Sequence, residues 1–208
     1  ERIDHVLKVL KSKVGDTLNI CLVGSGLGKG IFEEITSTHL KIKATEIAPR
    51  AQAPFELLIG VSRPHSCQKI LEHGTSMGVS NFNFFTAVLS EKSYLDSKLF
   101  LSPEKYLKYG LSQSGLYHKM PEVSLSKKFS GEQKFILHPG NNKTFQDYPL
   151  DPTKKITLAI GPERGFTRAE VEEFKNLGFL EVSIGAPILR VEIATFAALG
   201  QLHLLLKI

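Results

Sequence analysis

The sequence predicts an α/β protein with a mostly parallel sheet, preceded by a small β-rich unit. Two observations carry this prediction. Polar and apolar residues alternate in stretches of the first 50 residues, which is typical of antiparallel strands with one face in water. After a proline-flanked break at residues 49–54, short apolar runs alternate with helical segments, which favours a parallel sheet with crossover helices.

In the first unit we expect one or two helical turns at residues 5–10 and strands at residues 17–23 and 39–47. The glycine-rich stretch at residues 24–30 lies between strands and predicts a flexible hairpin loop. It does not match a nucleotide-binding motif. Lys29 stands where a dinucleotide fingerprint needs glycine, and Ile31 follows Gly30 where a phosphate loop needs a lysine with serine or threonine.

In the second unit we expect strands at residues 55–61, 81–85, 135–137, 156–160 and 181–184, and a loop at residues 124–134. A helix over residues 64–77 has Pro64 in its first turn. Thr167 with Glu170 three residues later predicts the start of another helix. The last helix, residues 194–206, is apolar almost all round, so it must be buried, and a second subunit is one surface that could cover it.

Composition narrows the class of protein. The chain of 208 residues carries a net charge of +5, and lysine is concentrated in residues 92–155. This basic segment fits a polyanion partner and, equally, a solvated surface. The two cysteines form no disulfide framework or zinc motif, and we expect no metal. No apolar run is long enough for a membrane span, no signal peptide is visible, and we expect a cytoplasmic protein. Because the chain begins at Glu1 without methionine, we expect further residues before it.

Three strand-ending loops in the C-terminal half predict a ligand site. Each apolar run stops at Gly and Pro residues: residues 138–142, 161–165 and 185–190. Ligands in open α/β sheets bind outside the carboxyl ends of the strands, where such loops can turn backbone groups toward them. Arg190 and Glu192 follow the third loop, immediately before the apolar helix. They fit either a functional role or an internal ion pair at the start of that helix.

These loops resemble one family of proteins. The segment IGPERGF at residues 160–166 is similar to the IGPEGGF motif of the RsmE family of ribosomal RNA methyltransferases. Residues 184–192 resemble its LGPRILRTET motif, and residues 137–139 resemble its third loop. Residues 113–121 resemble its EQSGR…VP segment, residues 78–93 its ELGV…SERS segment, and residues 5–10 its H…VLR start. The resemblance runs in order along nearly the whole chain.

The resemblance implies a PUA-like β-barrel at residues 1–50, expected to bind RNA, and a SPOUT domain with a trefoil knot at residues 51–208. It also implies a homodimer, formed through the knotted domain. The activity it implies is methylation of N3 of a uridine in small-subunit (16S) ribosomal RNA, with S-adenosylmethionine as cofactor. Naked RNA and the assembled small subunit are both possible substrates.

The resemblance also assigns residues. The expected cofactor-binding residues are Leu137, His138, Pro139, Ile160, Gly161, Pro162, Glu163, Gly165, Ile184, Gly185, Pro187, Ile188 and Leu189. Arg190 is the candidate stabiliser of a uracil anion, and Glu192 and Glu163 are candidate bases or orienting groups. The expected RNA-binding residues are Arg2, Lys8, Lys11, Lys13, Lys127 and Lys128.

Several residues depart from the family pattern. Arg164 replaces a glycine of the second loop, and Val191 and Ile193 replace both threonines of RTET. Ser112 and Leu116 replace a glutamate and an arginine, and Ser76 replaces the glutamate of ELGV. These changes keep three alternatives open: an RNA-binding protein without catalysis, a methyltransferase with another RNA target, and an α/β protein that binds a small molecule.

Overall fold

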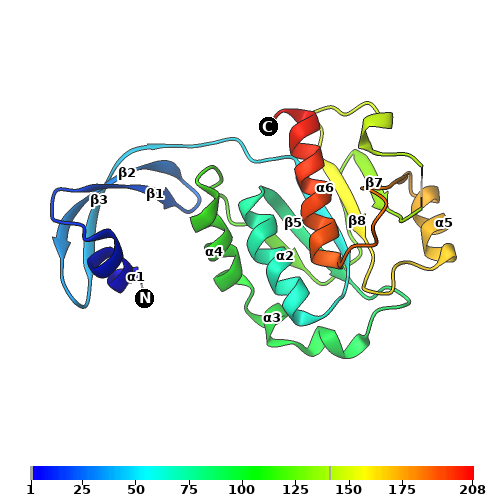
Figure 1. Ribbon diagram of the computed structural model, residues 1–208, viewed down its shortest axis with the longest axis horizontal. Helices are drawn as coiled ribbons and strands as arrows, with labels where there is room; N and C mark the ends of the chain where they lie inside the picture. The colour runs from blue at the N-terminus through cyan, green and yellow to red at the C-terminus, as the bar shows by residue number, and fades with distance from the viewer. Residues whose placement is uncertain (1, 141) are drawn as a thin grey trace. The chain divides into compact units, whose positions relative to one another are not determined.

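The computed structural model describes residues 2–140 and 142–208 and divides the chain into two compact units. The first unit contains residues 1–51 together with 115–119, and the second contains residues 52–114 and 120–208. Residues 115–119 therefore belong to the first unit, although in the sequence they lie between two stretches of the second unit. Figure 1 shows the elements of both units.

The first unit is a three-stranded antiparallel sheet in the order β1-β2-β3, preceded by short helical turns. Phe32, Val6 and Tyr117 are its large buried apolar residues. The described residues of this unit contain no further strand, and the closed barrel stays a prediction. The elements are α1 (Arg2–Asp4), the π-helical turn η1 (His5–Leu10), β1 (Thr17–Leu22), β2 (Gly26–Ile35) and β3 (Leu40–Ala48).

The hairpin predicted at residues 24–30 is present between β1 and β2, but the predicted length of its loop was wrong, because β2 begins at Gly26. The glycines serve close packing within the sheet. A Cβ on Gly28 would lie 2.7 Å from the Thr45 carbonyl oxygen, and one on Gly30 would lie 2.6 Å from a methyl group of Ile42. Such distances are far inside normal contact, so only glycine fits at these two positions.

The second unit is a six-stranded sheet in the order β6-β5-β4-β8-β7-β9, in which every pair is parallel. Its strands are β4 (Phe55–Gly60), β5 (Val79–Phe85), β6 (Glu122–Ser124), β7 (Gln133–Leu137), β8 (Ile156–Ile160) and β9 (Leu180–Val182). Its helices are α2 (Pro64–Ser76), η2 (Lys92–Asp96), α3 (Lys98–Leu101), α4 (Glu104–Ser114), η3 (Phe145–Asp147), α5 (Arg168–Asn176) and α6 (Val191–Leu206).

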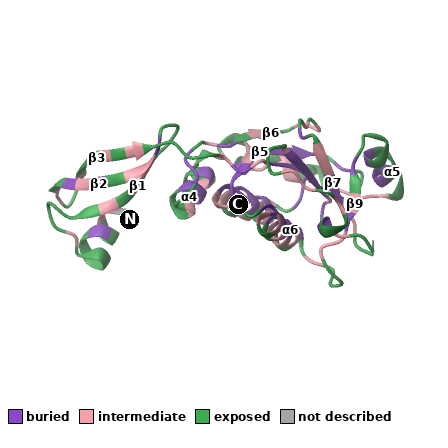
Figure 2. Ribbon diagram, turned by 90° about the horizontal axis from the view of Figure 1, so that it is seen from above, coloured by how far each residue is buried: buried purple, intermediate pink, exposed green. Residues whose placement is uncertain are grey.

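Helices cover both faces of this sheet. Helix α2 packs between α4 and α6, in front of the strands in Figure 1. On the other face, Val171 and Phe174 of α5 pack against Leu58, Ile136 and Ala159, which share a face because their strands pair in register. Strands covered on both faces need continuous apolar sequence, and β4 and β8 are buried at every residue. Figure 2 shows this contrast with the more exposed three-stranded sheet.

The capping box predicted for α5 is present. The Thr167 hydroxyl accepts a hydrogen bond from the Glu170 backbone N–H, and Glu170 Oε2 accepts one from the Thr167 backbone N–H at 2.8 Å. The second oxygen of Glu170 accepts from the Val88 N–H at 2.8 Å. The cap therefore also fixes the loop after β5.

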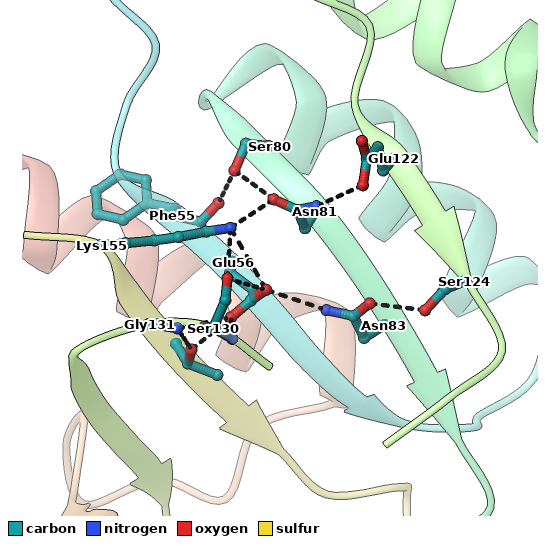
Figure 3. A network of polar contacts seen from close by, with 11 residues as sticks. Phe55, Glu56, Ser80, Asn81, Asn83, Glu122, Ser124, Ser130, Gly131 and Lys155 are labelled. Carbon is teal, nitrogen blue, oxygen red and sulfur yellow. Dashed lines mark hydrogen bonds and ion pairs between the residues drawn. The ribbon is translucent and has the colours of Figure 1, made fainter. Parts of the chain in front are cut away.

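A buried polar network lies at the amino ends of the strands (Figure 3). Its centre is Glu56, which is 3% exposed. Glu56 Oε2 accepts hydrogen bonds from the Thr157 hydroxyl at 2.6 Å and the Ser130 N–H at 2.8 Å, and Lys155 Nζ lies 3.5 Å from Oε1. Asn83 joins the network and accepts from the Ser124 hydroxyl at 2.7 Å. Because Ser124 and Ser130 flank the loop between β6 and β7, the network fixes both ends of that loop.

Candidate active site

The three predicted loops meet at the carboxyl ends of the strands, at the end of the sheet opposite to the Glu56 network. They follow β7, β8 and β9, whose carboxyl ends lie together because the strands are parallel and adjacent. Two adjoining cavities lie there, of about 690 Å³ and about 60 Å³. Leu137, His138, Pro139 and Leu189 line both cavities.

All of the expected cofactor residues lie on the walls of these cavities, and their binding role stays a prediction. The larger cavity adds Ile160, Gly161, Pro162, Glu163, Gly165 and Ile188, and the smaller adds Ile184, Gly185 and Pro187. The larger cavity is the more polar one, because Arg63, Ser66, Arg164, Arg190 and Glu192 also line it.

The second loop is a tight turn that packs closely on its neighbours. The Gly165 N–H donates to the Pro162 carbonyl at 2.8 Å, and Gly165 has a φ of +74°, which favours glycine. A Cβ on Gly60, at the end of β4, would lie 2.6 Å from Pro162 Cδ. The end of β4 and the second loop therefore touch through Gly60 and Pro162. Arg164 is exposed, so the bulky cation does not disturb this packing.

Glu163 connects the second loop to the start of α2. Its Oε1 accepts a hydrogen bond of 2.7 Å from the backbone N–H of Arg63, the residue immediately before that helix. The Arg63 guanidinium lies 3.9 Å from the same oxygen. A carboxylate at a helix N-terminus is favourable because backbone N–H groups are unpaired there. Glu163 therefore has a positioning contact already in place.

Arg190 and Glu192 have very different environments. Arg190 is exposed and is the residue before the first turn of α6. Glu192 is 4% exposed, and its Oε1 lies 3.7 Å from Nζ of Lys69 on α2. Burial acts to raise the pKa of Glu192. Hydrogen bonds from its own backbone and Ser66, with the charges of Lys69 and Arg190, leave that pKa below its ordinary value. The side chain is therefore ionised at neutral pH.

Sequence reasoning missed the contribution of α2. Arg63 and Ser66 line the larger cavity, and Lys69 pairs with Glu192. A usable signal was present, because the apolar run of β4 also ends shortly before a proline, Pro64, which begins α2. The same reasoning that selected the three later loops would have selected this one.

The expected RNA-binding residues lie in both units. In the first unit Lys8 pairs with Asp4 at 2.8 Å, and Lys11 and Lys13 are exposed. The side chain of Arg2 lies outside the part that the structure describes. In the second unit Lys128 is exposed, but Lys127 pairs with Glu173 at 2.8 Å and lies 4.7 Å from the centre of the Phe174 ring. Lys127 thus already has protein partners.

No described helix combines the length and apolar character that crossing a membrane requires. No group of three or more His, Cys, Asp or Glu side chains in the described part could hold a metal ion.

Comparison with known proteins decides the family. The model of the RNA methyltransferase domain family matches residues 49–203. The ribosomal RNA small subunit methyltransferase E of Treponema pallidum (strain Nichols) is 31% identical to this chain over 218 residues, which is 95% of this chain and 80% of the relative. The chain belongs to the ribosomal RNA small subunit methyltransferase E family. A methyltransferase E from Borreliella burgdorferi is 29% identical over 95% of this chain and 87% of that protein.

Solved structures show that the methyltransferase E family shares this fold. The Neisseria gonorrhoeae ribosomal RNA small subunit methyltransferase E, bound to S-adenosyl methionine, matches with a TM-score of 0.80 at 19% identity over 98% of this chain and 89% of that one. A Legionella pneumophila structure, described as a methyltransferase in complex with SAM, matches with a TM-score of 0.77 at 22% identity. The match covers 98% of this chain and 88% of that one. The predicted α/β fold with a parallel sheet is confirmed.

Proposed function

We propose that this member of the methyltransferase E family transfers a methyl group from S-adenosylmethionine to small-subunit ribosomal RNA, at N3 of a uridine. One observation carries the proposal. The residues that match the family's motifs come from three separate loops. They line one pair of adjoining cavities at the carboxyl ends of the strands. Family membership and the names of the relatives support the reaction class.

The residues of the site fit the proposed cofactor. The smaller cavity is lined mainly by apolar residues and would take part of the adenine ring, and the backbone groups of Leu137, Ile184 and Leu189 would hold the ring nitrogens. The larger cavity contains charged side chains and suits the amino-acid tail and the reacting base. When bound, the cofactor supplies an electrophilic methyl group, and positioning the nucleophile is then much of the catalysis.

The protein must stabilise the anion that uracil becomes on losing its N3 proton. We assign this role to Arg190, which is exposed at the cavity and offers paired donors to a carbonyl oxygen. The N3 proton leaves from the in-plane position that the methyl group must take, so a base cannot remain there during transfer. Glu163, which holds the start of α2, fits an orienting role better than that of a base.

The finer features of the fold belong to this proposal. We assign residues 51–208 to a SPOUT domain with a trefoil knot, and residues 1–50 to a PUA-like, RNA-binding unit. Cytoplasmic location follows from the substrate. The homodimer is supported by one face of α6, where Ile193 is 48% and Leu204 is 77% exposed while the intervening Ala197 and Gly200 are small. Small residues between large apolar ones allow close packing with a second helix.

The test is methyl transfer with a labelled cofactor. Purified protein is incubated with S-adenosylmethionine and either naked 16S ribosomal RNA or small subunits lacking the modification, and the labelled nucleoside is identified. We expect label in 3-methyluridine. Binding of the cofactor without transfer to either substrate favours the RNA-binding alternative, which the replacements Val191 and Ile193 support. Absence of cofactor binding at millimolar concentration would refute the proposal.

A further inference from the structure

Glu192 is a buried carboxylate with an unfilled hydrogen-bonding position. Its Oε1 faces Lys69, but its Oε2 is buried and has no hydrogen-bond partner. In the described part of the chain, the other buried side-chain atom without a hydrogen-bond partner is His118 Nδ1. An ionised oxygen without a donor is unfavourable in a protein interior, so its presence beside a cavity points to a ligand that brings one.

The charges around the larger cavity show what kind of ligand is missing. Arg63, Arg164 and Arg190 contribute positive charge to its walls, and Glu163 and Glu192 contribute negative charge. Glu163 already accepts a hydrogen bond from the Arg63 N–H. Among the lining carboxylates, Glu192 is the one that is buried and has an oxygen without a donor, and the donor that an anion binds best is a cation.

We infer, on the basis of the proposed function, that Glu192 binds the α-ammonium group of the cofactor's amino-acid tail through Oε2. The cofactor's second positive centre, its sulfonium, has no N–H or O–H and so cannot fill the position. The ammonium has three donors. The last torsion of a glutamate side chain is broad, which lets the carboxylate turn from the cavity wall toward the ligand. Lys69 and Ser66 keep the other side of the carboxylate in place.

This inference separates Glu192 from the role of base. A carboxylate whose pKa lies below its ordinary value holds a proton poorly. It also separates Glu192 from a purely structural role, since the pair with Lys69 uses only Oε1. The predicted contact is to a part of the ligand that both the cofactor and its demethylated product carry, so Glu192 holds the tail before and after transfer.

The experiment compares three ligands on two proteins by isothermal titration calorimetry. The ligands are S-adenosylmethionine, S-adenosylhomocysteine and 5′-methylthioadenosine, which lacks the amino-acid tail. The proteins are wild type and Glu192→Gln, with Glu172→Gln on α5 as a matched control outside the cavities. For Glu192→Gln we expect Kd to rise about tenfold or more for the first two ligands, which is the loss of one charge-assisted hydrogen bond. We expect the Kd of 5′-methylthioadenosine to change less than twofold.

Other outcomes overturn the inference. Equal weakening of all three ligands shows that Glu192 acts through the shape of the loops, and unchanged Kd values show that it does not contact the ligand. Weakening of S-adenosylmethionine alone assigns the effect to the sulfonium charge. If Glu192→Gln does not fold, wild-type protein is titrated with S-adenosylhomocysteine and its deaminated analogue, and less than a tenfold difference overturns the contact. Failure of wild type to bind S-adenosylmethionine refutes instead the proposed function.

Discussion

Replacing Glu56 with alanine should destabilise the second unit severely, although Glu56 lies far from the proposed active site along the strands. The change removes the acceptor of the Thr157 hydroxyl at 2.6 Å and of the Ser130 N–H at 2.8 Å. Each hydrogen bond to a charged group is worth about 1.5–3 kcal/mol. Lys155, whose side chain is 31% exposed, can be hydrated when its partner is lost. We therefore expect a loss of about 3–5 kcal/mol in the free energy of unfolding.

The assay is urea unfolding together with thermal melting. For a chain of this size the expected loss lowers Tm by about 6–20 °C. Glu122→Ala is the matched control, because Glu122 is exposed and accepts only from Asn81 at 3.1 Å within the same network. It should change stability by about 0.5 kcal/mol or less. A loss below about 1 kcal/mol for Glu56→Ala would show that the network does not hold the loop between β6 and β7.

The remaining predictions concern pH, catalysis, RNA binding and assembly. Burial acts to raise the pKa of Glu56, but hydrogen bonds from Ser130 and Thr157 and the charge of Lys155 leave that pKa lowered. The ionised Glu56 therefore stabilises the fold fully above its unfolded pKa of 4.5, and this stabilisation is lost as pH falls through its folded pKa. The stability difference between wild type and Glu56→Gln should thus shrink below about pH 4.5, and a difference that stays constant there contradicts the lowered pKa. Arg190→Ala should slow single-turnover methyl transfer about 10²–10³-fold with little change in cofactor Kd; a rate within a few-fold of wild type removes Arg190 from the reaction. Lys128→Ala should lower the slope of log affinity for single-stranded RNA against log salt by about 0.7, whereas Lys127→Ala should also lower Tm because Lys127 pairs with Glu173. By light scattering at micromolar concentration, the wild-type protein should have the mass of a dimer. The Leu204→Asp variant should have the mass of a monomer, since Leu204 is 77% exposed on α6. A monomeric wild-type protein would refute the dimer.

The sequence predicted those parts of the fold that local pattern determines. Mostly apolar runs identified β4 and β8, because strands that are buried on both faces do not alternate between apolar and polar residues. Thr167 and Glu170 marked the start of α5 correctly, because a capping box is a contact between residues three apart. The three strand-ending loops were found for the same reason.

What the sequence did not show depends on contacts between distant residues. The three-residue strand β6 is too short to show a period, and β2 contains glycines because neighbouring strands approach closely, not because the chain turns. The roles of Glu163 and Glu56 depend on partners that lie 100 and 101 residues away in the chain, Arg63 and Thr157. Local pattern identifies such residues as charged, but it does not show what they contact.

The pairing of β4 with β8 has a consequence for how this protein is made. Strand β4 ends at Gly60, whereas its inner neighbour β8 begins at Ile156. During synthesis, therefore, the edge of β4 that pairs with β8 stays unpaired, and both of its faces are apolar, until almost a hundred further residues have been added. Contacts of such long sequence separation form slowly, and an unpaired apolar strand is prone to aggregate in the meantime. The nascent chain should therefore be most prone to aggregate before β8 emerges from the ribosome.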